Sequence, residues 1–318
     1  MDKIIISTAQ FESKSGDKAF NLDLIDRISG QAAKDGSDVI SFHECSITGY
    51  GFARTLSKEE MLNVAEYIPE GQSIERLKKI AAKNGIIILA GLFEKDVEDH
   101  LYNTYVCVDP NGLIARHRKL HPFINTNLSP GNEFTVFNLL GWTCGILICY
   151  DNNVVENVRA TNLLGADIIF MPHVTMCTPS KRPGSGFVDA ALWLNRNQDP
   201  DFLRAEFDGP KGRSWLMKWL PARAYDNAAY VVFSNPIGMD FDQLKNGCSM
   251  ILDPFGEIIA ECRSLGNDFV SASIDPEKIE QAGGYRYKKA RRPALYADII
   301  GADHVSEQKV AWLQPEEN

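Results

Sequence analysis

The sequence predicts an α/β protein built as a four-layer α-β-β-α sandwich, and three observations lead to this prediction. The chain has 318 residues, of which 44% are hydrophobic and 24% charged, a composition typical of a globular protein with one large domain or two smaller ones. Strand-like apolar runs alternate with helical patterns, which favours sheets covered by helices. The same succession of segments occurs twice along the chain, which predicts two matching sheets packed face to face.

An internal repeat supports this arrangement. Its matching pairs are residues 36–42 with 165–170, 84–89 with 227–232, and 106–114 with 250–259. Each member of the last pair contains Asp-Pro-x-Gly, a tight turn that predicts a β-hairpin. Each half therefore predicts a helix, a strand, a long loop, a helix, a strand and a hairpin. Because either half alone would leave one sheet face bare, we expect a single domain over residues 1–283, followed by a tail over residues 284–318.

The elements of the first half each have their own signal. The apolar residues 4–6 predict a strand at the start of the chain, and residues 39–42 predict another. Two helices are predicted by apolar residues at helical spacing, which are Leu24, Ile28 and Ala32 in the first and Ile74, Leu77 and Ala81 in the second. The second helix should run from Ser73, at the N-cap position, to Asn84.

The second half contains a longer connection than the first. From Asp38 to Asn84 the chain runs 46 residues, whereas from Asp167 to Asn227 it runs 60. The excess lies in residues 172–221, a segment rich in Pro, Gly and Asn that also carries three tryptophans. Loops of this length in compact domains are often lids or binding loops. We expect either a substrate lid or a plain surface insertion.

Composition and charge exclude several classes of protein. The formal net charge of −9 argues against nucleic acid or an anionic membrane as a partner. The longest apolar stretch, residues 86–93, is too short to span a membrane, and the first residues have no signal-peptide layout. Seven scattered cysteines without a Cys-x-x-Cys pair predict reduced thiols in the cytoplasm. His117 and His121 lie four apart beside Pro122, outside any helix pattern, so we expect no metal site.

Cys149 lies at a position that suits a nucleophile. It follows the apolar run 145–148 and precedes a turn and the helix-like residues 154–160. Backbone N–H groups near such a turn favour negative charge, which predicts a thiolate. A buried, inert cysteine is the alternative. Glu44 and Lys119 also follow strand-like runs, although each of them alone fits a solvated loop or strand end.

Taken together, three motifs identify the chain as similar to the nitrilase superfamily of carbon–nitrogen hydrolases. The motifs are His43-Glu44 with Thr48-Gly49-Tyr50, Arg118-Lys119-Leu120-His121, and Cys149-Tyr150-Asp151 with Glu156 and Arg159. Further similarity at residues 165–167 and 222–227 extends the resemblance over roughly residues 3–275. The α-β-β-α sandwich of that superfamily agrees with the fold predicted from the repeat.

The resemblance implies a mechanism. Glu44 would be the general base, Lys119 the electrophilic stabiliser and Cys149 the nucleophile that forms a thioester. The backbone N–H of Tyr150 would share the oxyanion with Lys119. No metal or organic cofactor would be needed. The resemblance also implies a homodimer or higher homo-oligomer. The basic and aromatic residues at the start of the tail over residues 284–318 suit a segment that reaches across a neighbouring copy, and a disordered end is the alternative.

Departures from the family pattern bear on the substrate. Many members have a second glutamate shortly after the lysine, whereas residues 119–131 here contain no acidic residue and have Asn125 and Asn127 near that position. Cys149 is not followed by the Trp-Glu of true nitrilases. Nor is it followed by the arginine or histidine with which members that cleave N-carbamoyl amino acids hold the substrate carboxylate. A small neutral or cationic amide or N-carbamoyl amine is therefore the expected substrate. The candidate substrate-binding residues are Tyr50, Asn127, Asn152, Asn153 and His173.

Other functions remain open on these residues. The same motifs fit a nitrile hydrolase or an acyltransferase that passes the thioester to an amine. With the second glutamate missing, a non-catalytic member that only binds a small molecule is a further alternative.

Overall fold

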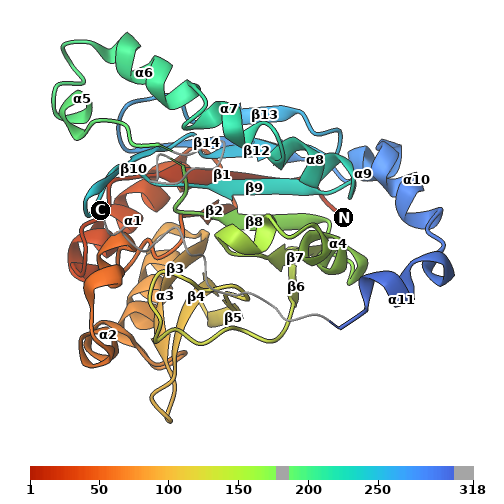
Figure 1. The fold of residues 1–318 in the computed structure, drawn as a ribbon, viewed down its shortest axis with the longest axis horizontal. Coiled ribbons are helices and arrows are strands. Elements are labelled where there is room, and N and C mark those ends of the chain that lie inside the picture. Colours follow the sequence, from red (N-terminus) through yellow and green to blue (C-terminus); the bar gives the residue numbers. More distant parts are fainter. Residues whose placement is uncertain (177–185, 304–318) are drawn as a thin grey trace.

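Two six-stranded sheets form the centre of the molecule (Figure 1). The computed structural model describes residues 1–176 and 186–303. The strands of the first sheet are, in spatial order, β14 (Asp268–Ile274), β1 (Ile4–Gln10), β2 (Val39–Ser41), β3 (Ile87–Lys95), β4 (Leu101–Asp109) and β5 (Gly112–Arg118). Those of the second are β13 (Ile258–Glu261), β12 (Met250–Leu252), β9 (Tyr230–Ser234), β8 (Ile168–Pro172), β7 (Trp142–Ile146) and β6 (Thr135–Leu139).

Helices cover the outer face of each sheet. On the first sheet, α1 (Lys18–Lys34) and α3 (Gln72–Asn84) bury Ile25 and Leu77 against strand residues such as Ile88. On the second sheet, α4 (Val155–Leu163) and α8 (Leu220–Tyr225) contribute to a core that includes Val231. Between the sheets lies a third core, which contains Ile6, Trp142 and Phe170. The four-layer α-β-β-α sandwich predicted from the sequence is therefore confirmed.

The internal repeat is visible in the strand pairing. β2 pairs in parallel with β3 in the first sheet, as β8 pairs in parallel with β9 in the second. The hairpins β4–β5 and β12–β13 follow, each with an aspartate at its turn. Asp109 accepts hydrogen bonds from the N–H groups of Asn111 and Gly112, and Asp253 accepts them from those of Phe255 and Glu257. Side-chain bonding of this kind explains why aspartate opens both turns.

One helix boundary differs from the expectation. Ser73 was expected at the N-cap of α3, but that helix begins at Gln72 after an N-cap glycine, Gly71. The backbone N–H and hydroxyl of Ser73 instead donate to the Glu66 carboxylate, each at 2.8 Å. The carboxylate thus accepts the hydrogen bond of a first-turn N–H, which is the role that a capping side chain would otherwise have.

Short helices make up part of the long connection between β8 and β9. It includes α5 (Ala190–Leu194), α6 (Pro200–Asp208) and α7 (Arg213–Leu216) before α8, and residues 177–185 lie outside the described part. Trp193, Phe207 and Leu216 are buried in the core on the second sheet. The described part of this segment is therefore an integral layer of the fold and not a plain surface insertion.

Shorter elements complete the described chain. Two 3-10 turns and one helix flank the site, namely η1 (Gly51–Thr55), α2 (Lys58–Val64) and η2 (Cys149–Asn152). A separate hairpin consists of β10 (Ile237–Asp240) and β11 (Gln243–Asn246). The C-terminal elements are α9 (Glu277–Gln281), α10 (Gly283–Lys289), η3 (Pro293–Leu295) and α11 (Ala297–Ile300). In Figure 1, α10 and α11 project on the side of the molecule where α4 lies.

Polar side chains join the two sheets next to the predicted site. The Ser41 hydroxyl of β2 lies 2.8 Å from the Ser234 hydroxyl of β9, and the Thr8 hydroxyl of β1 donates to the carbonyl of Phe233. These contacts hold the ends of β1, β2 and β9 together. They bring the segments that follow β2 and β8 to the same edge of the sandwich.

Candidate active site

Glu44 lies on a loop that crosses β3 at close range. The loop is anchored by the N–H of Ile47, which donates to the carbonyl of Gly91 at 2.9 Å. A side chain at Gly91 would place its Cβ 2.3 Å from the backbone nitrogen of Cys45, so only glycine allows this approach. The crossing fixes the backbone of Glu44 just past the end of β2.

The Glu44 carboxylate is buried and fully engaged. Its Oε1 accepts hydrogen bonds from Lys119 Nζ and Asn103 Nδ2, both at 2.6 Å, and its Oε2 accepts one from the N–H of Val174 at 3.1 Å. Only 1% of Glu44 is exposed. A buried carboxylate is tolerated when it is paired and hydrogen-bonded, and here all three donors are supplied.

Lys119 is buried beside this carboxylate. It follows β5, and its backbone N–H donates to the carbonyl of Asn103 at 2.8 Å. Burial acts to lower the pKa of the Lys119 ammonium, but the negative charge of Glu44 outweighs it and the pKa lies above its ordinary value. The rings of Phe123 and Tyr50 lie 4.8 and 5.5 Å from Nζ. Lys119 is therefore a fixed positive charge in an apolar surrounding.

Cys149 opens η2 in a strained backbone conformation. Its φ is +52°, in the left-handed region that non-glycine residues rarely adopt. Strain of this kind persists where the surrounding structure holds it in place. The Glu44 carboxylate and the N–H of Val174 lie close enough to the thiol to shift its pKa, the first upward and the second downward. The structure thus brings Glu44, Lys119 and Cys149 into one buried cluster.

The expectation that this turn favours a thiolate is wrong. Burial, followed by the charge of Glu44, raises the pKa of the Cys149 thiol to about 12, although Lys119 opposes this shift. The first turn of α4 does not help, because α4 begins at Val155 and the intervening residues form η2. Burial and the Glu44 charge therefore favour the protonated thiol.

Tyr150 supplies a free donor beside the thiol. In residues 1–176 and 186–303, no group accepts a hydrogen bond from its backbone N–H. Its ring packs edge-on against His121 and Phe123. The free N–H and the Lys119 ammonium are thus two donors near Cys149.

Tyr50 and His173 lie against this cluster. Within the described residues the buried Tyr50 hydroxyl has no hydrogen-bond partner, and burial together with the Glu44 charge raises its pKa. His173 follows β8, and burial together with the Lys119 charge lowers its pKa, so the ring is neutral. Its Nδ1 also has no partner in the described chain. Both residues therefore have unused polar atoms next to the cluster.

The three asparagines are placed differently. Asn152 is buried and donates its amide to the carbonyl of Leu147 and to His173 Nε2. The carbonyl of Asn153 accepts from Arg223 at 3.2 Å. Asn127 donates through its backbone N–H and its side-chain amide to the side-chain oxygen of Asn125. These bonds stabilise the turn at Cys149 and the loop after Lys119.

Asn125 lies in the region where many family members have the second glutamate, but its side-chain amide binds elsewhere. Its amide donates to the carbonyls of Ala53 and Leu56, at 2.7 and 2.8 Å. It therefore ties the loop after Lys119 to η1.

Sequence reasoning missed three contributors. Asn103 and the N–H of Val174 both bind the Glu44 carboxylate. Asp151 lies two residues after Cys149 and accepts hydrogen bonds from both loops of the cluster. Asp151 belongs to the third motif, and an acidic residue beside a nucleophile was the available signal. Asn103 lies in a strand and Val174 acts through its backbone, so neither has a signal in the sequence.

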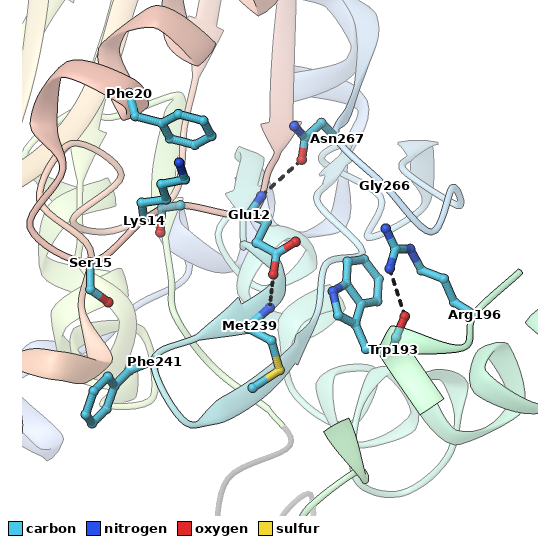
Figure 2. A pocket seen from close by; sticks show the side chains of 11 residues that line it. Glu12, Lys14, Ser15, Phe20, Trp193, Arg196, Met239, Phe241, Gly266 and Asn267 are labelled. Carbon is cyan, nitrogen blue, oxygen red and sulfur yellow. Dashed lines mark hydrogen bonds between the residues drawn. The ribbon is translucent and has the colours of Figure 1, made fainter. Parts of the chain in front are cut away.

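A separate cleft of about 630 Å³ lies away from these residues (Figure 2). Its walls include Phe20 of α1, Trp193 of α5 and Met239 of the β10–β11 hairpin. Glu12 crosses it, accepting a hydrogen bond from the Met239 N–H and donating its own N–H to Asn267. None of Glu44, Lys119 and Cys149 lines it, so the cleft is not the candidate active site.

The described part of the chain contains neither a group of metal ligands nor a membrane-spanning helix. Among residues 1–176 and 186–303, no three His, Cys, Asp or Glu side chains are grouped as metal ligands. In the same residues, no helix is both long and apolar enough to cross a bilayer.

Fold and site together define a carbon–nitrogen hydrolase. The model of the carbon-nitrogen hydrolase family matches residues 5–283, and the chain belongs to this family, within the nitrilase superfamily. It is 28% identical to a nitrilase of Pyrococcus abyssi, over 80% of this chain and 83% of that protein. It is also 28% identical to an (R)-stereoselective amidase of a Pseudomonas species, over 91% of this chain and 92% of that protein.

A solved structure agrees with this assignment. Nit3 of Saccharomyces cerevisiae, a member of branch 10 of the nitrilase superfamily, superposes with a TM-score of 0.68. The match is 25% identical in sequence and covers 88% of this chain and 92% of that chain.

Proposed function

We propose that this protein hydrolyses the C–N bond of a small linear amide or N-carbamoyl amine through a thioester on Cys149. The observation that carries the proposal is the contact of one buried carboxylate with both a lysine and a thiol. Glu44 accepts from Lys119 Nζ at 2.6 Å, and its charge raises the pKa of the neighbouring Cys149 thiol. This arrangement suits nucleophilic catalysis with a base, a nucleophile and an electrophilic stabiliser.

In the first step, sulfur attacks the substrate carbonyl carbon while Glu44 takes the thiol proton. Proton removal must accompany attack, because a thiol whose pKa is about 12 is almost wholly protonated at neutral pH. Glu44 lies near enough to raise the pKa of the thiol, so the base is close to the proton that it must take.

The attack moves negative charge onto the carbonyl oxygen. The Lys119 ammonium and the Tyr150 N–H are the donors proposed to stabilise this oxyanion. Donors that are fixed before the reaction stabilise the transition state without reorganisation. Glu44 then gives its proton to the nitrogen, the C–N bond breaks, and ammonia or an amine leaves with the acyl group held as a thioester.

Water completes the cycle. Glu44 removes a proton from water as its oxygen attacks the thioester carbon, and the tetrahedral intermediate collapses with release of the acid. The proton on Glu44 returns to the Cys149 sulfur. The sum is one amide and one water converted into one acid and one amine.

The surroundings of the cluster support a neutral polar head group. Tyr50 and His173 have unpaired polar atoms there, and His173 is held neutral. An amide or urea-like group both donates and accepts hydrogen bonds, which such atoms can satisfy. Among the relatives, the name of the Pseudomonas protein is that of an amidase.

Ammonia release from a panel of aliphatic amides, N-carbamoyl amines and nitriles tests the proposal, with Cys149→Ala as control. We expect release from at least one amide or carbamoyl compound and none by the variant. Turnover of nitriles alone would favour a nitrile hydrolase, and amide formation with added amines would favour an acyltransferase. Activity that survives in Cys149→Ala would overturn the mechanism. A wild type that neither turns over any compound nor forms a mass-shifted adduct would favour a binding protein.

Two further properties are proposed with this function. We propose that the protein acts in the cytoplasm as a homodimer or higher homo-oligomer, with contacts from the C-terminal segment. In that segment Leu295, Ile299 and Ile300 are 60%, 76% and 60% exposed. Exposed apolar side chains on a short terminal element favour association. Light scattering after gel filtration tests this, and a monomer at micromolar concentration would contradict it.

A further inference from the structure

Asp151 connects the two loops that carry Lys119 and Cys149. Its Oδ1 accepts a hydrogen bond from the N–H of His121 at 2.9 Å. Its Oδ2 accepts from the N–H of Leu120 at 3.2 Å and from the N–H of Ile148 at 3.1 Å. One carboxylate thus holds the two residues after the lysine and the residue before the cysteine.

The surroundings make this carboxylate a rigid anchor. Asp151 is fully buried, and its own N–H donates to the carbonyl of Ile148 at 3.0 Å. His117 Nε2 lies 3.7 Å from Oδ2, and both side chains are inaccessible to solvent. Hydrogen bonds from backbone N–H groups to a buried charge are stronger than those between neutral groups. The three N–H groups therefore hold one another in a fixed relation through Asp151.

The proposed chemistry depends on the relative positions of the two loops that Asp151 connects. Cys149 adopts its left-handed φ of +52° between the anchored Ile148 and Asp151 itself. Lys119 directly precedes the anchored Leu120 and His121. A displacement of about 1 Å between reacting groups can reduce a rate about 100-fold.

We propose that Asp151 is a positioning residue that sets the distance between the Lys119 ammonium and the Cys149 sulfur by binding both of their loops. The proposal rests on the proposed function, in which these two groups act on the same carbonyl. Asp151 acts through the backbone on either side, and its charge also contributes to the raised pKa of Lys119.

Asp151→Asn keeps the volume and removes the charge, so that an NH₂ group faces a backbone donor. Asp253→Asn is the control at the turn of the β12–β13 hairpin, because Asp253 is 3% exposed and also accepts from two backbone N–H groups, at 3.0 and 3.2 Å, and from Lys278 Nζ at 2.7 Å. Both variants lose charged acceptors for backbone N–H groups at a turn. Only the first loses a connection between the two loops.

The measurements are kcat and KM on the best amide and the rate of Cys149 alkylation by iodoacetamide at pH 7, all below the melting temperature of each variant. For Asp151→Asn we expect kcat to fall about 100-fold, KM to change less than about threefold, and alkylation to slow about tenfold or more. Asp253→Asn should remain within about threefold of the wild type in all three. Equal losses in the two variants, or no loss in either, would overturn the proposal.

Two controls keep the result interpretable. If the wild type turns over no amide, the proposed function fails, while the alkylation rates still test Asp151. If Asp151→Asn does not fold, amide hydrogen exchange in the wild type replaces it. The N–H groups of Leu120, His121 and Ile148 should then exchange at rates within about tenfold of one another, because one carboxylate protects all three. Fast exchange at Leu120 and His121 beside slow exchange at Ile148 would contradict the connection.

Discussion

Lys119 Nζ lies 2.6 Å from Glu44 Oε1, and both side chains are shielded from solvent. Neither charge can be solvated by water if the other is removed. The pair therefore behaves as a unit, in which each member is required for the other to remain charged in this surrounding. Predictions for either residue must include this coupling.

Glu44→Gln should reduce kcat for amide hydrolysis about 10²–10⁴-fold, because the thiol loses the base that takes its proton. The change should also reduce the free energy of unfolding by about 3–5 kcal/mol, since it leaves the buried Lys119 unpaired. Steady-state kinetics and urea unfolding measure the two effects. Glu66→Gln is the control, because Glu66 pairs with Lys18 at 2.7 Å outside the cluster. A Glu44→Gln enzyme with more than about a tenth of wild-type kcat would rule out this role.

Lys119→Met should reduce kcat by at least about 10²–10³-fold, the loss expected when one oxyanion donor is removed. It should also reduce the free energy of unfolding by about 3–5 kcal/mol, because it leaves the buried Glu44 carboxylate without its cation. Methionine has a similar length and no charge, so packing against Phe123 is largely kept. Stopped-flow and steady-state kinetics would locate the loss in acylation, deacylation or both. An effect on KM alone would assign Lys119 to substrate binding.

The pH dependence of Cys149 alkylation separates a preformed thiolate from a thiol deprotonated by Glu44. In the wild type the rate should be nearly flat from pH 7 to 9, because Glu44 takes the proton during attack. In Glu44→Gln the pKa of the thiol falls below about 12, since the raising charge is gone, but burial still holds it above its ordinary value. The rate in that variant should rise about tenfold per pH unit over the same range.

Mass spectrometry of the peptide containing Cys149 measures these rates, with Cys149→Ala to identify labelling elsewhere. A wild-type rate that rises steeply with pH while Glu44→Gln is flat would be the reverse of the expectation.

Asn125→Asp should destabilise the fold by about 2 kcal/mol or more near neutral pH. The new carboxylate would face the carbonyls of Ala53 and Leu56, which now accept from the Asn125 amide. The folded state then favours the protonated carboxyl, so the loss appears above the ordinary carboxyl pKa and shrinks as the pH falls toward it. Urea unfolding at pH 7 and pH 4 measures the effect. Equal losses at both values would argue against these contacts.

The sandwich and its cluster could largely be predicted from local patterns. Apolar runs identify strands, and Glu44 follows β2 whereas Cys149 follows β7, the parallel neighbour of β8. A repeat that places β2 and β8 in equivalent positions therefore also brings the ends of β2 and β7 to one edge. Lys119 likewise follows a strand that the sequence predicts, β5. Side chains at strand ends are therefore the part of a site that a sequence predicts well.

The protonation state of Cys149 could not be predicted in this way. It depends on burial and on the Glu44 charge, which come from packed segments distant in sequence. The role of Asn152 is a similar case, because its amide bonds to the carbonyl of Leu147 and to His173 only after the turn has formed. Ser73 illustrates competition, since Glu66 bonds the group that was expected to cap α3. Each miss has the same cause, a partner that the local pattern does not contain.

The pairing of β14 with β1 has a consequence for how the chain is made. Ser7 lies opposite Ser271, so the first strand of this sheet to be translated waits for the last one. At about 5–20 residues per second, β14 emerges roughly 10 s after Cys149, while β1 exposes an unpaired edge. Synthesis that stops before residue 268 leaves that edge open to other nascent chains. The last strand of the sheet to be translated thus covers the edge of the first one.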